Sequence, residues 1–239
     1  MTAFTVLVTG GSSASGIAVA RAMVAAGHRV ITVGSDEARI KAAAAETGAA
    51  VTPLVCNLAS LDSVRDLASA IANLGVEGID GVMHLVGGWR GAKGIEDQTD
   101  EDWEALERGA VTTLRNVSRV FYGQLEASAH GRFAMVSSTA VSAPTAAAAS
   151  YVAAKAAAEA WTLAVADGFR RAQEGGTADG GSAAVIFVVK ALVDAGMRQL
   201  HPERRFPGFT DVEDLAAAAV GLFDQPASTL NGQRIMLAK

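Results

Sequence analysis

The sequence contains one cysteine, Cys56, in 239 residues. A lone cysteine cannot form an internal disulfide framework and suits a reducing compartment, so we expect a cytoplasmic protein in which Cys56 serves packing. No stretch approaches the roughly 18 to 20 uninterrupted apolar residues of a membrane span. The first apolar run lacks a basic start and breaks at Thr9-Gly10-Gly11, which argues against a signal peptide.

Positive charge is also scarce. The chain has 20 Lys and Arg against 25 Asp and Glu, a formal net charge of −5. A mildly acidic chain is a poor general binder of nucleic acid or anionic membranes, and no block of like charges indicates an interaction tail. Half of the residues are apolar, enough for a substantial core. We therefore expect residues 1–239 to form a single domain.

Short β-branched runs alternate with longer alanine-rich segments. Strands are expected at Phe4–Thr9, Arg29–Val33, Ala50–Val55, Gly81–Val86, Arg132–Ser137, Ala183–Val189 and Gln233–Leu237. Helices are expected at Ser15–Ala26, Asp36–Thr47, Leu61–Leu74, Asp100–Ala127, Ser150–Arg171 and Asp211–Phe223. This alternation predicts an α/β fold: a doubly wound parallel sheet of about seven strands with helices on both faces. The glycine-rich stretch Gln173–Ser182 is expected to be a surface loop.

The segment Ser150–Arg171 carries small apolar residues on nearly every face and few charges. A helix with little polar surface is usually buried, either within its own protein or by a partner. We therefore expect a homo-oligomer, a dimer or tetramer, with this helix at a subunit interface.

A glycine- and serine-rich turn, TGGSSASG, follows the first predicted strand. In open parallel sheets the backbone N–H groups of such a turn, and the helix N-terminus after it, bind phosphate. The turn resembles the Thr-Gly-x-x-x-Gly-x-Gly turn of the short-chain dehydrogenase/reductase family. Thr9, Gly10 and Gly16 match, and Ala14 replaces the middle glycine. An alanine there costs little at a helical φ but ~1 to 2 kcal/mol at a positive φ.

A second group of residues carries the same resemblance. The stretch SYVAAK places Tyr151 and Lys155 one helical turn apart, and Ser138 stands at the carboxyl end of a predicted strand. These three match the family's Ser and Tyr-x-x-x-Lys set in type, order and spacing. The resemblance covers essentially the whole chain and is to members like the 3-oxoacyl-carrier-protein reductases. It implies a Rossmann-like fold and an oxidoreductase that transfers a hydride between a nicotinamide cofactor and a small carbonyl or alcohol substrate, of ketone or 3-oxoacyl type.

The resemblance implies a catalytic role for each of the three. A free tyrosine has a pKa of about 10, and a lysine cation together with an oxidised nicotinamide favours the phenolate; a shift of three units needs ~4 kcal/mol. Tyr151 would donate or accept the proton, Ser138 would orient the carbonyl oxygen, and Lys155 would also bind the nicotinamide ribose. No metal is expected.

The resemblance also implies cofactor-binding positions. They are Gly10, Ser12, Ser13, Gly16, Ile17, Ser35, Asn57, Leu58, Gly87, Tyr151 and Lys155. Gly34 and Ser35 stand where an acidic residue would hold the ribose of NAD, which favours NADP(H); NAD(H) stays open because Asp36 follows closely. Asn57 either contacts the adenine or caps a loop. His84 replaces the family's first asparagine in Asn-Asn-Ala-Gly and, without a partner histidine at metal-like spacing, is predicted to be structural.

Other positions depart from the family pattern. Ala110 stands where the family often has an asparagine that supports a proton relay, and Asn116 lies on another helix face. Lys190 and Ala195 replace a Pro-Gly pair and a threonine that contact the cofactor; Lys190 either meets a phosphate or acidic substrate or stays solvated. These departures leave an alternative open, a catalytically impaired nucleotide-binding module with a regulatory or structural role.

The segment from about 194 to 210 occupies the place of the family's substrate flap. It carries four residues that are or can be cationic: Arg198, His201, Arg204 and Arg205. These side chains either bind an acidic substrate or acyl-carrier partner, or belong to a solvated loop.

Overall fold

The computed structural model describes residues 3–48, 50–174 and 181–238. Seven strands form one parallel sheet in the order β3-β2-β1-β4-β5-β6-β9, which confirms the predicted architecture. The strands are β1 (Thr5–Thr9), β2 (Arg29–Gly34), β3 (Val51–Val55), β4 (Gly81–His84), β5 (Arg132–Ser138), β6 (Ala183–Val189) and β9 (Arg234–Met236). The strand order reverses between β1 and β4, so a crevice opens at their carboxyl ends.

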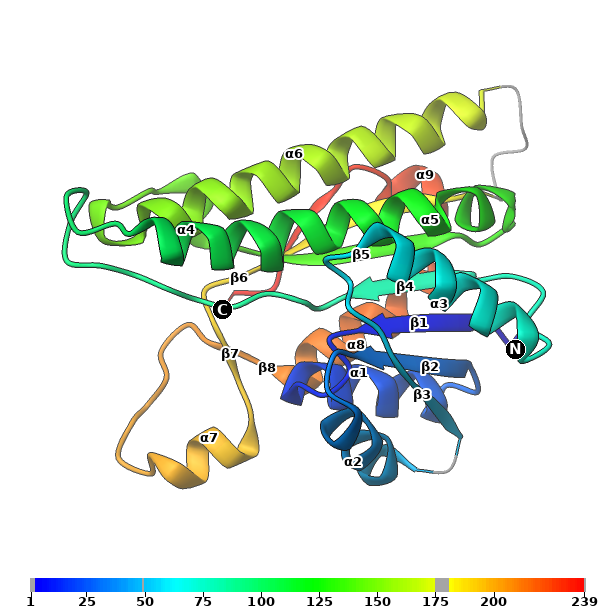
Figure 1. Ribbon diagram of the computed structural model, residues 1–239, viewed down its shortest axis with the longest axis horizontal. Helices are drawn as coiled ribbons and strands as arrows, with labels where there is room; N and C mark the ends of the chain where they lie inside the picture. Colours follow the sequence, from blue (N-terminus) through cyan, green and yellow to red (C-terminus); the bar gives the residue numbers. More distant parts are fainter. Residues whose placement is uncertain (1–2, 49, 175–180, 239) are drawn as a thin grey trace.

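Helices cover both faces of this sheet (Figure 1). The main helices are α1 (Ala14–Ala25), α2 (Glu37–Thr47), α3 (Leu61–Asn73), α4 (Asp100–Glu107), α5 (Thr113–Ala127), α6 (Ala149–Ala172) and α8 (Val212–Gly221). One buried cluster joins α3, α5 and α6 to the sheet, and a second joins α1, α8 and the short α9 (Ala227–Leu230) to its other side. Within the described residues no helix combines the length and apolarity needed to cross a membrane.

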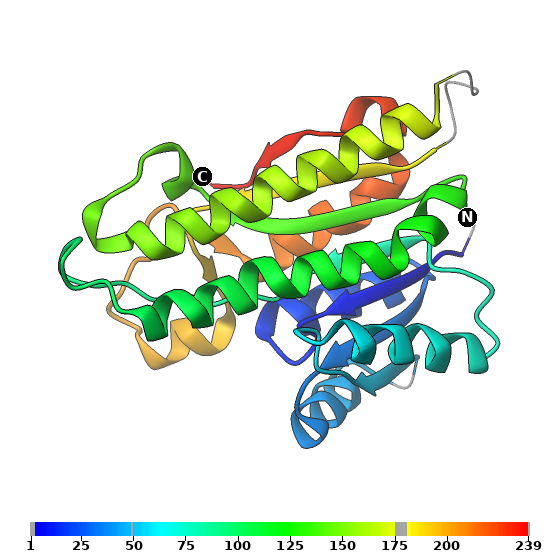
Figure 2. The same cartoon turned by 45° about the horizontal axis from the view of Figure 1, so that its top comes forward.

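The central strands are buried on both sides, as their continuous apolar runs predicted. All seven residues of β6 are buried, and the rings of Phe133 and Phe187 are essentially inaccessible. Figure 2 shows α4, α5 and α6 lying over one face, with the starts of α4 and α6 at the same end of the molecule as α7. This end corresponds to the carboxyl ends of the strands.

The helix expected at Asp100–Ala127 forms with these bounds but contains a change of helix type. A π-helical turn at Arg108–Thr112 separates α4 from α5. Gly109 lowers the helical propensity there, and the hydroxyl of Thr113 donates to the Gly109 carbonyl oxygen at 2.8 Å, in competition with the regular backbone pattern. Such turns often occur at functional sites, and this one faces the crevice.

The segment from residue 192 to 211 has structure that the sequence did not predict. Strands β7 (Leu192–Val193) and β8 (Thr210–Asp211) pair in parallel, and α7 (Ala195–Leu200) lies between them. The aromatic rings of Phe206 and Phe209 pack edge to face with centroids 5.5 Å apart. The predicted surface loop Gln173–Ser182 lies partly outside the described residues, which omit 175–180.

Candidate active site

The glycine turn joins β1 to α1 at the crevice. The amides of Gly10 and Gly11 both donate to the Val33 carbonyl oxygen at 3.0 Å, which fixes the turn to β2. Ser13 begins the helix: its hydroxyl accepts from the Gly16 amide at 3.0 Å and donates to the Gly10 carbonyl oxygen at 2.8 Å. An N-cap of this kind stabilises a helix by ~1 kcal/mol and orients its first amides toward the crevice.

Two glycines of the turn are sterically required. Gly10 has φ +77°, and a Cβ there would lie 2.9 Å from the Leu85 carbonyl oxygen. A Cβ on Gly16 would lie 2.4 Å from the Gly10 carbonyl oxygen, inside contact distance. Ala14, in contrast, is the exposed first residue of α1, and its φ is not positive. Of the two alternatives for this departure, the structure therefore supports the one in which alanine costs little.

One cavity of about 370 Å³ lies beside the ends of β1, β2 and β3. It is lined by five of the predicted cofactor-binding residues, Gly10, Ser12, Ser35, Asn57 and Leu58. Asn57 also caps its loop, because its side-chain oxygen accepts from the Ala59 amide at 3.1 Å. Cys56 lies in the same wall; burial raises the pKa of its thiol to about 11, so it is protonated and serves packing as predicted.

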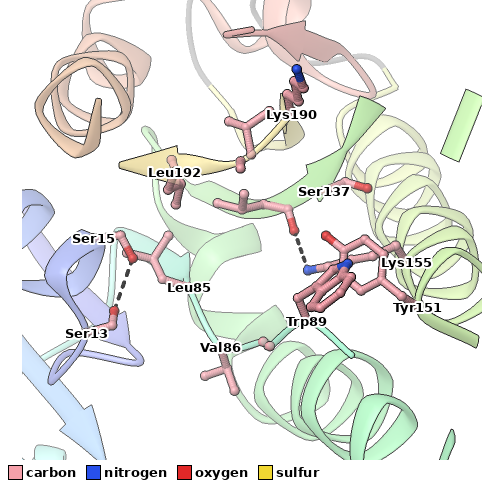
Figure 3. Close-up of a pocket in the computed structure, with 15 residues that line it drawn as sticks. Ser13, Ser15, Leu85, Val86, Trp89, Ser137, Tyr151, Lys155, Lys190 and Leu192 are labelled. Carbon is pink, nitrogen blue, oxygen red and sulfur yellow. Dashed lines mark hydrogen bonds between the residues drawn. The ribbon is translucent and has the colours of Figure 1, made fainter. Parts of the chain in front are cut away.

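A second cavity of about 320 Å³ lies on the other side of Val86, which lines both. It is lined by Ser13, Gly87, Tyr151 and Lys155. Figure 3 shows Ser13 and Ser15 on the opposite side of this cavity from Tyr151 and Lys155. The fold thus brings the glycine turn and the Tyr-x-x-x-Lys pair to one hollow.

Two predicted cofactor-binding residues lie outside these cavities. Gly16 is buried directly under the turn. Ile17 lines a separate hollow of about 320 Å³ with Ala14 and Arg21, between α1 and the start of α7.

The phenol of Tyr151 is held at the N-terminal end of α6. Burial raises its pKa, and the hydrogen bond with Ser138 offsets part of that rise. Ser138 ends β5, is 3 % exposed and accepts from the Ala140 amide at 3.2 Å. The protein groups therefore leave the phenol's pKa raised, because removal from water outweighs the favourable contact. The predicted lowering also required an oxidised nicotinamide beside the phenol, so it stays a prediction.

Lys155 lies one turn further along α6 and is 7 % exposed. Its ammonium donates to the Val136 carbonyl oxygen at 2.8 Å. Burial lowers its pKa to about 8, against the attraction of Glu159. Gly87 leaves room for the amine, because a Cβ there would lie 3.2 Å from Nζ. The site therefore holds a phenol near an amine that is largely charged at pH 7 and loses its proton around pH 8.

A buried carboxylate stands behind this amine. Glu159 accepts from the Ser137 hydroxyl at 2.5 Å and from two guanidinium nitrogens of Arg234 at 2.9 and 3.2 Å. This group could not be predicted from the sequence, because Arg234 belongs to the last strand, 75 positions away.

His84 is 2 % exposed at the end of β4. Its Nδ1 lies 2.8 Å from the Thr9 hydroxyl and its Nε2 lies 3.2 Å from the Thr113 hydroxyl. Burial, and then the charge of Lys155, lower its pKa to about 3, so the ring is neutral. The histidine links β1, β4 and α5, which matches the structural role predicted for it.

The residues considered where the chain departs from the family pattern all contact other parts of the protein. Ala110 is buried against Ala154 and Tyr151, with no polar group to offer. Asn116 points elsewhere, as predicted: its amide donates to the Leu58 carbonyl oxygen at 3.0 Å. Lys190 lines the second cavity, but its ammonium donates to the Pro207 carbonyl oxygen at 3.0 Å.

Two of the flap cations have partners in the flap or directly beside it. Arg198 pairs with Asp211 at 2.8 Å. The Arg204 guanidinium lies 5.0 Å above the Phe206 ring and 5.5 Å above the Phe209 ring. These contacts give both arginines a packing role, which differs from both predicted alternatives, an acidic ligand and a solvated loop.

Sequence reasoning also missed Trp89, which lines the second cavity and is 71 % exposed. Trp89 follows directly after Gly87 and Gly88, which end the apolar run of β4. This position in the sequence could have indicated a residue of the site. A large apolar side chain at the carboxyl end of a parallel strand lies where such folds bind ligands.

Comparisons with known proteins bear on the fold and the family of the chain. The model of the short chain dehydrogenase family matches residues 4–173. A short-chain type dehydrogenase/reductase from Mycobacterium ulcerans is 23 % identical, with a TM-score of 0.82 over 99 % of this chain and 90 % of that one. An oxidoreductase of the family from Burkholderia thailandensis is 24 % identical, with a TM-score of 0.83 over 99 % and 92 %.

A third similar structure is an NADPH-bound short chain oxidoreductase from Pseudomonas aeruginosa PAO1, described as containing an atypical catalytic center. It is 21 % identical, with a TM-score of 0.82 over 98 % of this chain and 95 % of that one. A search of the curated proteins finds no match. At these identities the structures show a shared fold, and the family model covers well over half of the sequence. The chain belongs to the short-chain dehydrogenase family.

Proposed function

We propose that the protein is an NADP(H)-dependent oxidoreductase that reduces the carbonyl group of a small substrate, or oxidises the corresponding alcohol. The observation that carries this proposal is the meeting of Ser13, Tyr151 and Lys155 on one cavity. A turn suited to binding phosphate and a phenol suited to exchanging a proton line the same cavity, and this combination supports a reaction on a bound dinucleotide.

The residues present fit a dinucleotide. Gly10 and Gly16 keep the turn free of side chains that would fill the approach to its amides. The two cavities meet at Val86 along the ends of the strands, as an extended ligand with two nucleotide halves requires. Gly10, Ser12, Ser35, Asn57 and Leu58 would hold the adenosine half, and Ser13, Gly87, Tyr151 and Lys155 the nicotinamide half. When bound, the nicotinamide supplies the hydride.

The chain's own residues would then manage the proton and the orientation of the substrate. Ser138 would donate a hydrogen bond to the carbonyl oxygen and hold it near the phenol. Tyr151 would give its proton to that oxygen during reduction, or take one back during oxidation. Lys155, in its charged form, would stabilise the phenolate left behind. Because burial alone raises the pKa of Tyr151, this charge is needed for the proton transfer to occur near neutral pH.

The preference for NADP(H) over NAD(H) is also a proposal. Ser35 lines the adenosine-side cavity where a carboxylate would repel a 2′-phosphate. The nearby Asp36 is occupied as the N-cap of α2, where it accepts from the Arg39 amide at 2.8 Å. The side chain of Arg108 lines the same cavity and is available to a phosphate. The NADPH-bound relative from Pseudomonas aeruginosa supports the same choice by analogy.

Three further proposals concern organisation and substrate. Residues 1–239 act as one domain, with the segment from about 194 to 210 as a substrate flap. The protein forms a homo-oligomer through α6, whose Leu163 is 41 % exposed. The substrate is a ketone or a 3-oxoacyl compound; a structure 23 % identical to this chain, with a TM-score of 0.82, carries the proposed identity of a betaketoacyl-ACP reductase.

A Tyr151→Phe variant tests the proposal. We expect turnover, followed by loss of the reduced-nicotinamide absorbance with a panel of carbonyl compounds, to fall by at least about 1,000-fold, while the affinity for NADPH stays within about threefold. Titration with NADPH and NADH compares the two cofactors in the same experiment. Undiminished turnover in the variant contradicts the role of Tyr151. Cofactor binding by the unmodified protein with no turnover of any carbonyl favours the alternative, a nucleotide-binding module without catalysis.

A further inference from the structure

Trp89 is unusually exposed for a tryptophan that lines a cavity. It is 71 % exposed and lines the same cavity as Tyr151 and Lys155 (Figure 3). Tryptophan has one of the largest apolar surfaces among side chains, and its flat face attracts aromatic rings and other planar groups. Such a surface beside a reactive phenol offers a binding face to a substrate.

The loop that carries Trp89 is tied to the segment that carries the phenol. The Ala92 amide donates to the Ala147 carbonyl oxygen at 2.8 Å. The side chain of Gln98 bridges the same two segments: it donates to the Ala146 carbonyl oxygen at 3.1 Å and accepts from the Ser150 amide at 3.1 Å. Ser150 directly precedes Tyr151, so these bonds fix the loop relative to the phenol.

The ring of Trp89 also rests on its own loop. A Cβ on Gly91 would lie 2.6 Å from the indole carbon Cζ2 and 3.2 Å from the Ala147 carbonyl oxygen. Only glycine permits the ring to lie there without a shift. The loop is therefore shaped around the position of the indole.

The charges around this wall do not suit an anionic substrate. The two lysines that line the cavity have protein partners, Lys155 on the Val136 carbonyl and Lys190 on the Pro207 carbonyl. Arg90, next to Trp89, pairs with Asp102 at 2.8 Å. Trp89 and residues of α4 line a common hollow. Residues 89–108 carry seven Asp or Glu against Arg90, Lys93 and Arg108. A carboxylate or phosphate that approaches Trp89 along α4 would therefore meet a net negative surface.

We propose that Trp89 is the substrate-recognition residue of the site and that it selects uncharged aromatic ketones, whose ring stacks on the indole while the carbonyl oxygen reaches Tyr151. This inference rests on the proposed carbonyl reduction and narrows its substrate. It disfavours carboxylates and acyl groups carried on a phosphorylated arm. The rest of the cavity also suits an uncharged ring, because its lining includes the apolar residues Val86, Val136, Val189 and Leu192.

Three probe substrates separate ring stacking from charge: methyl benzoylformate, the benzoylformate anion and methyl pyruvate. The unmodified protein should reduce methyl benzoylformate with a kcat/KM at least about tenfold above the other two. Trp89→Ala should lower that value about tenfold, as expected for the loss of one stacking partner, and leave methyl pyruvate within about twofold. Trp89→Phe should recover most of the loss. The control is Trp103→Ala, on α4 outside the cavity and 40 % exposed, which should change none of these values.

A binding experiment separates this inference from the proposed reaction. The chain has three tryptophans, so the indole ¹H–¹⁵N signal of Trp89 can be assigned by comparison with Trp89→Ala. Acetophenone, added to Tyr151→Phe loaded with NADPH, should shift this signal more than those of Trp103 and Trp161. If this shift is seen but the unmodified protein reduces none of the carbonyl probes, the proposed reaction fails and the recognition site stands. The inference would be overturned if Trp89→Ala lowered kcat/KM equally for the aromatic and the aliphatic ester. It would also be overturned if acetophenone did not shift the indole signal of Trp89.

Discussion

Glu159 should control the charge of Lys155. The carboxylate lies one helical turn from the amine, and both residues are 7 % exposed. Burial lowers the pKa of Lys155 to about 8, and Glu159 is the group that opposes this fall. Replacement of Glu159 by glutamine keeps the shape of the side chain and its bond with Ser137 but removes the negative charge. The pKa of Lys155 should therefore fall further.

The size of the effect follows from the geometry. At roughly 6 Å, the separation of side chains one turn apart, and an effective dielectric constant of about 20, two unit charges attract by about 3 kcal/mol, or about 2 pKa units. Arg234 shares the carboxylate at 2.9 Å, which reduces the part felt by Lys155. We expect a fall of about 1 to 2 units, enough to make Lys155 largely neutral at pH 8.

Carbon-13 NMR of the lysine ε-carbons measures this directly. The chain has five lysines, and the signal of Lys155 is identified by its loss in Lys155→Met. In Glu159→Gln the midpoint of its titration should move to lower pH, and the pH above which reduction slows should move with it. The matched control is Glu37→Gln, which breaks an exposed pair with Lys41 at 2.6 Å and should leave Lys155 unchanged. An unchanged midpoint in Glu159→Gln would refute the reasoning.

Three further predictions concern His84, Gly16 and Ala14. His84 is neutral and buried with a pKa of about 3, whereas the unfolded chain binds a proton near pH 6.5. Because the unfolded state then binds more protons, stability should fall as pH drops from 6.5 toward 3, by about 2 kcal/mol at pH 5 for this residue alone. The free energy of unfolding is measured with urea at pH 7 and 5 for the unmodified protein and for His84→Asn. It should fall less between these pH values in the variant, and an equal fall would contradict the prediction. Gly16→Ala places a Cβ against backbone and should weaken NADPH binding at least about tenfold in a fluorescence titration. Ala14→Gly, at an exposed helical position, should keep or tighten it, and a large loss there would show that the turn is misassigned.

The sheet and its main helices were predictable because their signals are local. Continuous apolar runs such as Ala183–Val189 indicate strands buried on both faces, and the structure buries every residue of that run. The spacing of Tyr151 and Lys155 is likewise a property of one helix, so the sequence alone placed the two side chains on one face. The glycine turn could be located for the same reason, since a strand, a turn and a helix follow one another directly.

The parts that could not be predicted depend on distant contacts. The π-helical turn before Thr113 coincides with a hydrogen bond to His84, 29 positions earlier in the chain. The pairing of Glu159 with Arg234 likewise spans 75 positions. Strands β7 and β8 have two residues each, too few for any periodicity. Residue types alone also could not reveal that Arg204 lies on two aromatic rings.

The pKa of Tyr151 could not be predicted for a different reason. The sequence predicted that a lysine cation and an oxidised nicotinamide together would lower the pKa of Tyr151, an argument based on nearby charges alone. In the folded protein burial dominates and raises that pKa, while Lys155 directs its ammonium to the Val136 carbonyl oxygen. Desolvation depends on everything packed around a group, so it becomes known only with the structure.

Isotope transfer tests the central claim most directly. NADPH carrying deuterium on the transferring face of C4 is incubated with the protein and methyl benzoylformate, and the alcohol is analysed by mass spectrometry. The account predicts one deuterium on the former carbonyl carbon of the product, and essentially no product from a Tyr151→Phe variant that still binds NADPH. Labelled product formed at the same rate by that variant would contradict it.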